Sequence, residues 1–293
     1  MKPFSGIDIT TDKDNEVYNG DEFIVARPSL ENQKTLEKAT DDSIELIDKA
    51  FRPSLRLRIP LYITGVLSLL GIITLDTAFE VISEDPDPNV NLAFFFSKVP
   101  WLFFLIGAVI ITFIVLLVIT VRKSKAILNS DENESVENVM DAAISRIFEE
   151  FGVPDDAVWA DLLSFSYVMK NGEPVIKKSK DDISDCLNIE YKVYVRDGCL
   201  YAVTSEGKYA FPLDSLVAIR KIEKKLSMFG WNKDIEHNKG VYKQYKMKND
   251  DYSNVIIRYY YVLESQAYGQ NWGIYFPPYE LELIERLTGL KAE

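Results

Sequence analysis

Residues 59–75 read IPLYITGVLSLLGIITL and residues 101–121 read WLFFLIGAVIITFIVLLVITV, and neither stretch contains a charged residue. A helix needs about 20 predominantly apolar residues to cross the hydrocarbon core of a bilayer. The second stretch has that length by itself, and the first reaches it if its helix continues past Asp76. The sequence therefore predicts two membrane-spanning helices at 59–80 and 100–121, joined by a loop at 81–99.

Basic residues gather on the outer flanks of these two helices, in the segments 49–58 and 122–125. They are Lys49, Arg52, Arg56, Arg58, Arg122, Lys123 and Lys125, whereas the connecting loop contains only Lys98. Lysines and arginines close to membrane-spanning helices stay on the cytoplasmic side. We therefore expect a multi-pass protein of the cell membrane, with both termini in the cytoplasm and the loop outside. Neither helix is expected to be a cleaved leader, because the first begins far from Met1.

The rest of the chain shows no pattern typical of catalysis or of a metal site. Its net charge of −12 argues against nucleic acid as a partner. Cys186 and Cys199 lack metal-ligand spacing and are interpreted as small buried residues, and the single histidine, His237, as a loop residue. The acids at 155, 156 and 161 are interpreted as helix-terminus and turn residues. We expect a non-enzymatic protein without cofactors, although carboxylate pairs leave no sequence signature by which an enzyme could be recognised.

Helical periodicity flanks the two apolar stretches. Apolar residues recur at helical spacing over 29–51 and again over 136–151, where Gly152 and Pro154 end the pattern. An acidic segment, 130–134, precedes the second pattern and is interpreted as part of a linker. The predicted organisation is an N-terminal cytoplasmic segment at 1–56 with an amphipathic helix, a transmembrane pair at 57–122, a linker at 123–134 and a cytoplasmic domain at 135–293.

Alternating apolar residues and turn pairs predict strands in most of that last domain. Asp197-Gly198 joins strands at 189–196 and 199–204, and Asn171-Gly172 joins strands at 162–170 and 174–178. Further strands are expected at 208–211, 216–225, 241–248, 254–264 and 273–276, and a helix capped by Gly289 at 279–287. The predicted fold class is α+β, with a two-helix transmembrane hairpin followed by an antiparallel β-rich domain that has a C-terminal helix.

Two stretches of this domain resemble the bacterial pleckstrin-homology-like (PH-like) families, which include YcxB-like membrane proteins. They are KYAFPLDSL at 208–216, and GIYFPP at 273–278 running into the helix at 279–287. The resemblance covers about half of the chain. The leading helix, the leading hairpin and an insert at 227–240 depart from it. It implies a bent sheet closed at one end by the terminal helix, and a binding or assembly module rather than an enzyme.

Basic residues of the β-rich domain are candidates for contact with anionic lipid. They are Arg220, Lys221, Lys224, Lys225, Lys243, Lys246 and Lys248. If the strands that carry them pair, their side chains could form a patch facing the inner leaflet, where each basic residue near the surface gains about 1 kcal/mol. The alternative is a solvated strand face whose charges protect an edge.

Aromatic residues of the same domain leave two further alternatives open. Tyr259, Tyr260 and Tyr261 could line a ligand or peptide groove, or could pack across strands. The apolar tip of the insert, from Met228 to Trp231, could enter the membrane interface or fold back onto the sheet.

Charged residues also lie at the predicted outer end of the two apolar helices. Asp76 and Glu80 share one face of the first helix, and Lys98 precedes the second helix. They could sense an ion or ligand outside, or simply reach water and one another at the interface.

These patterns favour a non-enzymatic membrane protein whose cytoplasmic domain binds inner-leaflet lipids or a protein partner. An alternative is a sensor or immunity-type protein that receives a signal at its outer loop. A third is a structural subunit that forms a homo-oligomer through the two apolar helices.

Overall fold

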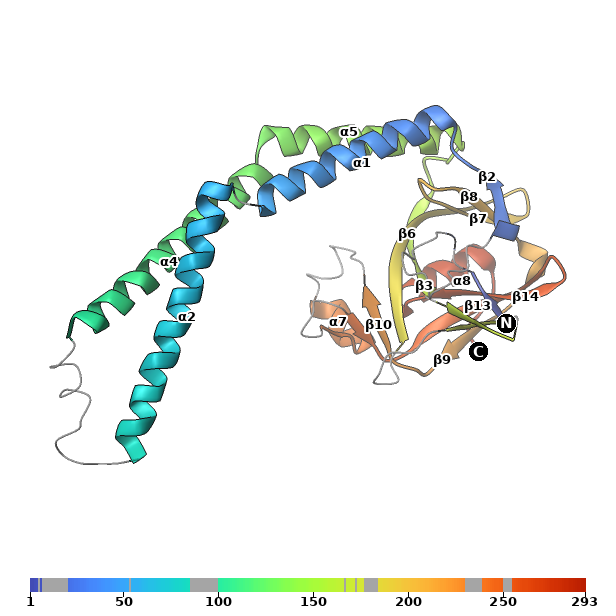
Figure 1. The fold of residues 1–293 in the computed structure, drawn as a ribbon. Helices are drawn as coiled ribbons and strands as arrows, with labels where there is room; N and C mark the ends of the chain where they lie inside the picture. The colour runs from blue at the N-terminus through green and yellow to red at the C-terminus, as the bar shows by residue number, and fades with distance from the viewer. Residues whose placement is uncertain are drawn as a thin grey trace. The chain divides into compact units, whose positions relative to one another are not determined.

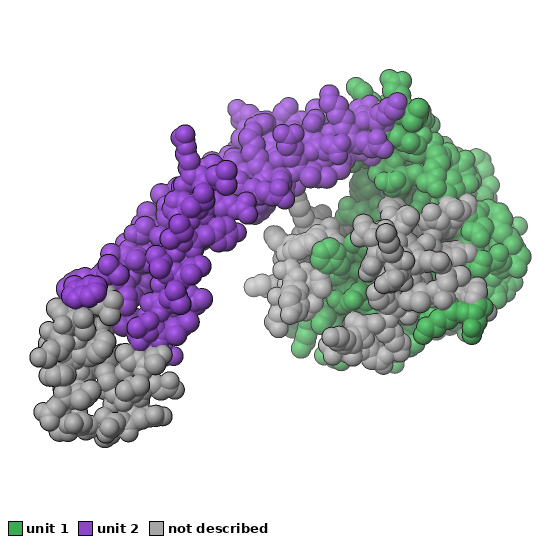
Figure 2. Space-filling model, in the orientation of Figure 1, with its two compact units in different colours: residues 1–33, 144–293 green, residues 34–143 purple. Residues whose placement is uncertain are grey.

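The computed structural model describes the chain except residues 5, 7–20, 53, 85–99, 166, 172, 177–183, 230–238 and 250–254. The fold is mixed α+β, with six α-helices and two main sheets among the described residues. It divides into two compact units (Figure 2). One, the helical unit, comprises residues 34–143, and the other, the β-rich unit, combines residues 1–33 with 144–293. Residues 1–33 therefore belong to the same compact unit as most of the C-terminal domain. The sequence had suggested a separate N-terminal segment at 1–56.

Two long apolar helices, α2 (Leu55–Glu84) and α4 (Pro100–Leu128), lie side by side in the helical unit (Figure 1). Glycines permit their close approach. A Cβ atom at Gly71 would lie 2.9 Å from Cγ2 of Ile106, and one at Gly65 would lie 3.1 Å from the ring of Phe113. Because residue numbers rise along α2 as they fall along α4, the two helices run antiparallel.

The apolar side chains of α2 and α4 are mostly exposed. Leu69 is 60% exposed and Ile111 is 64% exposed, and most of their apolar neighbours are similar. The segments Leu55–Asp76 and Phe104–Leu128 are each long and apolar enough to cross a membrane. Such exposure is unfavourable in water, so another apolar phase or partner must cover these helices.

A second helix pair, α1 (Leu30–Phe51) and α5 (Asp131–Glu150), also lies side by side (Figure 1). Lys49 near the end of α1 pairs with Glu132 at the start of α5, and Asn32 near the start of α1 donates a hydrogen bond to Glu150 at the end of α5. The buried residues of α1 are Ala39, Leu46 and Ala50, seven and four positions apart, so they share one face of the helix.

The linker predicted at 123–134 is wrong, because both of its ends are helical. Helix α4 continues to Leu128 and α5 begins at Asp131. Ser130 accepts a hydrogen bond from the backbone N–H of Asn133, as N-cap residues do. The acids of 131–134 occupy the first turn of α5, where negative charge stabilises the helix dipole.

Two main sheets form the β-rich unit. The four-stranded sheet has the order β1 (Lys2–Pro3), β14 (Gln270–Phe276), β13 (Tyr260–Ala267), β9 (Leu216–Ile222). The eight-stranded sheet has the order β11 (Lys248–Asn249), β12 (Val255–Ile257), β10 (Leu226–Phe229), β6 (Ser184–Arg196), β7 (Cys199–Val203), β8 (Lys208–Pro212), β2 (Ile24–Ala26), and β3 (Val158–Phe165) also pairs with β6. Strands β4 (Tyr167–Lys170) and β5 (Glu173–Ile176) form a separate ribbon.

One predicted hairpin is present, and the other is present only in part. Strands β6 and β7 pair through the turn at Asp197-Gly198, where both residues have positive φ. Strand β4 pairs with β5, but residues 162–165 of the predicted first strand belong to β3, which pairs with β6. Two other predictions are wrong. Residues 241–248 are not one strand, since helix α7 spans Lys239–Tyr245 and only the short β11 follows. The start of the predicted insert is strand β10, which pairs in parallel with β6.

Both edges of the four-stranded sheet are occupied by segments near the two ends of the chain. Strand β1 pairs in parallel with β14. At the opposite edge, Ala292 forms a bridge with Ile219 of β9, and the N–H of Glu293 donates to the carbonyl of Ile219 over 2.9 Å. These contacts join residues that are far apart in sequence.

Two apolar cores fill the β-rich unit, and β13 contributes to both. Leu263 packs with Trp272, Phe276 and Phe211 in the first core. Tyr260 and Val262 of the same strand pack in the second core. Helix α8 (Leu281–Thr288) adds the buried Ile284 to the first core and ends at Gly289, whose φ is 73°. The predicted terminal helix and its glycine cap are confirmed.

Candidate functional site

A basic hollow lies where α1 ends, α2 begins and α4 ends. Its volume is about 360 Å³. Its polar lining residues are Lys49, Arg52, Ser54, Thr120, Lys123 and Ser124. Three cations and three hydroxyl groups therefore converge at one end of the two apolar helices.

The end of α1 is held against α4 by Ser124. Its hydroxyl lies 2.7 Å from the carbonyl oxygen of Ala50 and 3.1 Å from that of Thr120, so it can donate to either. Ala50 is buried, so the contact closes one wall of the hollow. The wall joins residues 74 positions apart in sequence.

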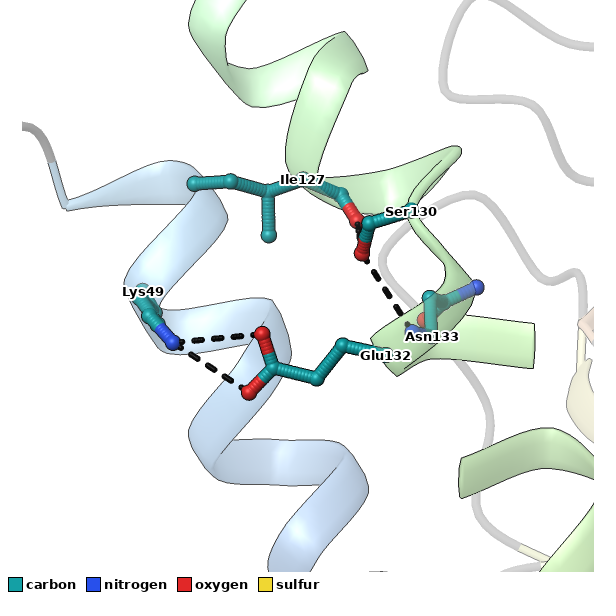
Figure 3. A network of polar contacts seen from close by, with 5 residues as sticks. All are labelled: Lys49, Ile127, Ser130, Glu132 and Asn133. Atoms are coloured by element: carbon teal, nitrogen blue, oxygen red, sulfur yellow. Dashed lines mark hydrogen bonds and ion pairs between the residues drawn. The ribbon is translucent and has the colours of Figure 1, made fainter. Parts of the chain in front are cut away.

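The turn from α4 into α5 lies beside the hollow (Figure 3). Nζ of Lys49 lies 3.3 and 3.4 Å from the two carboxylate oxygens of Glu132. The hydroxyl of Ser130 donates to the carbonyl of Ile127 over 2.6 Å and also caps α5. Lys49 and Ile127 both line the hollow. The contact between Lys49 and Glu132 therefore holds the end of α4 and the start of α5 against α1.

The hollow retains uncompensated positive charge. Lys49 faces Glu132, and Arg52 faces Asp48 over 3.0 Å. Lys123 has no ion pair with any residue that the structure describes. Both ion pairs are exposed, so each contributes at most about 1 kcal/mol and leaves the cations accessible to an anion.

More cations lie around the same ends of α2 and α4. Arg56, Arg58, Arg122 and Lys125 are exposed there, and the guanidinium of Arg58 lies 5.7 Å from the ring centroid of Tyr62. The antiparallel arrangement of α2 and α4 brings the two basic flanks to the same end of the helix pair.

The basic residues predicted on the sheet are not brought together by strand pairing. Strand β9 pairs with β13, not with the 239–248 segment, so the expected pair of basic strands is wrong. Arg220 pairs with Glu264 over 3.1 Å, and Lys221 pairs with Glu223 over 2.7 Å. Lys224 and Lys225 are exposed in the connection from β9 to β10, Lys243 lies on α7, Lys246 follows α7, and Lys248 lies on β11.

The predicted outer-face residues are only partly described. Asp76 is exposed on α2, Glu80 lies on the same helix, and Lys98 falls outside the described residues. His237, Trp231 and the basic residues at 177–180 also fall outside them. Within the described ranges, no group of three or more His, Cys, Asp or Glu residues could hold a metal ion.

Tyrosines 259–261 take part in packing. Tyr260 is buried near Phe165, and the ring of Tyr261 stacks on Phe276 at 5.8 Å. Tyr259 meets Tyr261 edge to face. Met228 of the supposed insert tip is buried in the second core, whereas Phe229 is exposed. The cross-strand packing alternative accounts for these tyrosines.

A buried acidic cluster joins β3 to the start of the terminal helix. Asp161, expected in a turn, lies inside β3 and is almost fully buried. The hydroxyl of Tyr279 donates to the carboxylate of Asp161 over 2.6 Å. The backbone N–H of Asp161 donates to the carboxylate of Glu280 over 3.1 Å. Burial raises the pKa of Glu280 to about 7 and, with the charge of Asp161, raises that of Tyr279. This cluster was missed because Asp161 lies 118 and 119 residues before Tyr279 and Glu280.

Of the two cysteines, Cys186 fits the expected buried residue and Cys199 is half-buried. Burial raises the pKa of the Cys186 thiol, so the thiolate nucleophile is disfavoured there.

Comparison of the chain with protein-family models, with curated proteins and with solved structures gives no match. The function must therefore be inferred from the chain's own residues. Its strongest feature is the basic hollow at the ends of two exposed apolar helices.

Proposed function

We propose that the protein is a multi-pass protein of the cell membrane that binds anionic phospholipid at the basic hollow. In this proposal α2 and α4 form a transmembrane hairpin, and both termini lie in the cytoplasm. The observation that carries it is the convergence of Lys49, Arg52 and Lys123 in one hollow beside the exposed apolar helices. Basic residues at the cytoplasmic ends of membrane helices form typical pockets for lipid headgroups.

The chemistry of the hollow suits a phosphate group. Ammonium and guanidinium groups attract its charge, and the Ser54 hydroxyl can donate to its oxygens. The hydroxyls of Thr120 and Ser124 already donate to backbone carbonyls. Leu57, Ile127 and Ala50 provide an apolar part of the lining that suits the start of the acyl chains. A lipid there would contact α1, α2 and α4 together.

The β-rich unit is proposed to be a PH-like module that acts close to the inner leaflet. Support comes from helix α8, whose buried Ile284 packs in a core shared by strands of both sheets. The resemblance of segments 208–216 and 273–287 to PH-like families agrees with a binding role. Tethering through α4 would keep such a module at high local concentration near the membrane.

Topology can be tested with single cysteines in a chain whose Cys186 and Cys199 are replaced by alanine. We expect a membrane-impermeant maleimide to label Asn89→Cys in intact cells and Glu206→Cys only after the cells are opened. Labelling of Glu206→Cys in intact cells would contradict the cytoplasmic placement. A denatured sample of each variant is the positive control, because it shows that the introduced cysteine can react with the maleimide.

Lipid binding can be tested with two neighbouring lysines of α4. Lys123 lines the hollow and Lys125 does not, although both are exposed. In purified full-length protein, Lys123→Gln should lower retention of phosphatidylglycerol about fivefold, as loss of about 1 kcal/mol implies. Native mass spectrometry measures the retained lipid, with phosphatidylcholine as the uncharged comparison. Equal effects of Lys123→Gln and Lys125→Gln would contradict a specific site and favour general surface charge.

The two other functions predicted from the sequence have less support. The outer loop at 85–99 falls outside the described residues, so outward sensing stays a prediction. Homo-oligomerisation through α2 and α4 also stays a prediction, which the mass of the solubilised protein can test.

A further inference from the structure

A second hollow lies inside the β-rich unit. Its volume is about 360 Å³, and it is formed by the turn after α5, the end of β6 and helix α8. Val158, Val193 and Leu287 line its apolar part, and Arg196 and Arg286 line its charged part. The volume is at the small end of the range for ligand sites, which is roughly 300–1,000 Å³.

Both arginines of the hollow are exposed. Arg196 and Arg286 form no ion pair with any described residue, unlike Arg220, which pairs with Glu264 over 3.1 Å. The guanidinium of Arg196 lies 5.7 Å from the ring centroid of Tyr194, and this contact restrains its orientation. A guanidinium presents a planar fork of donors that matches a carboxylate or phosphate.

Tyr194 adds an unused polar group to the same lining. The side chain is only 5% exposed, and its hydroxyl has no hydrogen-bond partner among the residues that the structure describes. Its ring stacks on Tyr201 with centroids 4.9 Å apart, which holds the ring in place. A buried hydroxyl without a partner is unfavourable, and a ligand that accepts its hydrogen bond would remove the penalty.

We propose that this hollow binds a small organic carboxylate. The two guanidinium groups would hold the carboxylate, and the valines with Leu287 would cover a short hydrocarbon group. Asp156 also lines the hollow, so the formal charge of its side chains is two positive and one negative. A net single positive charge matches a carboxylate better than a phosphate monoester, which carries about −1.5 to −2. The site is independent of the lipid proposal, because all its residues belong to the β-rich unit.

The test uses the full-length protein in phosphatidylcholine nanodiscs, with isovalerate as the probe. Ligand-observed saturation-transfer NMR should show saturable binding of isovalerate and none of isovaleramide, its neutral isostere. Empty nanodiscs correct for partition of the probe into lipid. Saturable binding of both probes, or of neither at tens of millimolar, would overturn the proposal.

Variants assign the binding to the hollow. Arg196→Gln and Arg286→Gln should each weaken isovalerate binding about tenfold or more, whereas Arg258→Gln, an exposed arginine outside the hollow, should not change it. Circular dichroism spectra and unchanged melting show that each variant is folded, which is expected because all three arginines are exposed. Unchanged affinity in Arg286→Gln would overturn the assignment. Inorganic phosphate that displaces isovalerate at a lower concentration would overturn the preference for carboxylate.

Discussion

Apolar residues have opposite surroundings in the two units. In the helical unit, Leu69 and Ile111 are 60% and 64% exposed, whereas in the β-rich unit Leu263 and Phe276 are 0% exposed. The β-rich unit covers its own apolar surface with two sheets and α8, but α2 and α4 cover each other along only one face. The difference teaches that composition alone does not define a core. The β-rich unit buries its own apolar side chains, whereas the helical unit needs an outside apolar phase or partner to cover them.

The largest expected difference between the units concerns large-to-small changes. Leu263→Ala should lower the free energy of unfolding of the β-rich unit by about 2–5 kcal/mol, since it leaves a cavity in a packed core. Leu69→Ala in α2 should leave that transition unchanged. Urea unfolding in detergent, followed by the fluorescence of the buried Trp272, measures both variants. Equal effects would contradict the division into two units.

A lysine at an exposed apolar position should have a large effect in the helical unit and a small one in the β-rich unit. In the proposed topology Ile111→Lys should disfavour membrane insertion by about 3 kcal/mol, because it would place a charge within the hydrocarbon core. Val217→Lys, on the exposed face of β9, should change folding by less than about 0.5 kcal/mol. Resistance to carbonate extraction reports insertion. Full insertion of Ile111→Lys would argue that α4 lies in water or in a protein interface.

The buried acid Glu280 should make the β-rich unit less stable as pH rises. Its folded-state pKa of about 7 exceeds the ordinary value of 4.5, so the folded state binds the proton more tightly than the unfolded state. Stability should fall between about pH 4.5 and 7 and remain lower above pH 7, by on the order of 2–3 kcal/mol.

Glu280→Gln tests this origin, because glutamine keeps the oxygen that accepts from the N–H of Asp161. The variant should be more stable than the parent at pH 8 and nearly equal to it at pH 4.5. Melting temperature measured across this range checks the prediction. Glu282→Gln, an exposed change two residues later at the start of α8, is the control. A pH profile unchanged by Glu280→Gln would assign the dependence to other groups.

The smallest effect separates two glycines. Gly289 ends α8 with a φ of 73°, so Gly289→Ala should destabilise the β-rich unit by about 1 kcal/mol. Gly107 lies within α4, where an added Cβ would meet nothing within 4 Å. Gly107→Ala should therefore leave the β-rich unit unchanged and favour helix by roughly 0.5–1 kcal/mol. Circular dichroism with thermal melting distinguishes the two signs, and destabilisation by both would contradict the free space beside Gly107.

Local signals predicted much of the fold. The Asp197-Gly198 pair located the β6–β7 turn because both residues adopt positive φ there, and Gly289 located the end of α8 for the same reason. The two long apolar stretches located α2 and α4 because no other pattern competes over that length. Short-range chemistry was sufficient wherever an element is specified by its own residues.

Predictions failed where long-range packing decides the structure. Val241, Tyr242 and Tyr245 face the second core from α7, a spacing that suits a helix, whereas a strand had been predicted over 241–248. Strand β10 has only four residues and is stabilised by pairing with β6, some forty positions earlier in the chain. No local pattern reports such a pairing.

The two hollows also differ in how far the sequence predicts them. The cations of the basic hollow were visible in the sequence as helix flanks, and antiparallel packing of α2 with α4 brings them together. Arg196 and Arg286 were not considered, because they are 90 positions apart and each resembles an ordinary surface arginine. A buried tyrosine hydroxyl without a partner can be recognised only in three dimensions.

The occupied edges of the four-stranded sheet restrict how this protein can associate. A free edge strand is a template on which another chain can add a strand or begin an aggregate. Here β1 covers β14, and Ala292 with Glu293 covers part of β9, so strand addition would first require displacement of the chain's own segments. Substitutions that displace Lys2 or Ala292 from these positions would expose an edge of this sheet, and such variants risk edge-to-edge aggregation even with both cores intact.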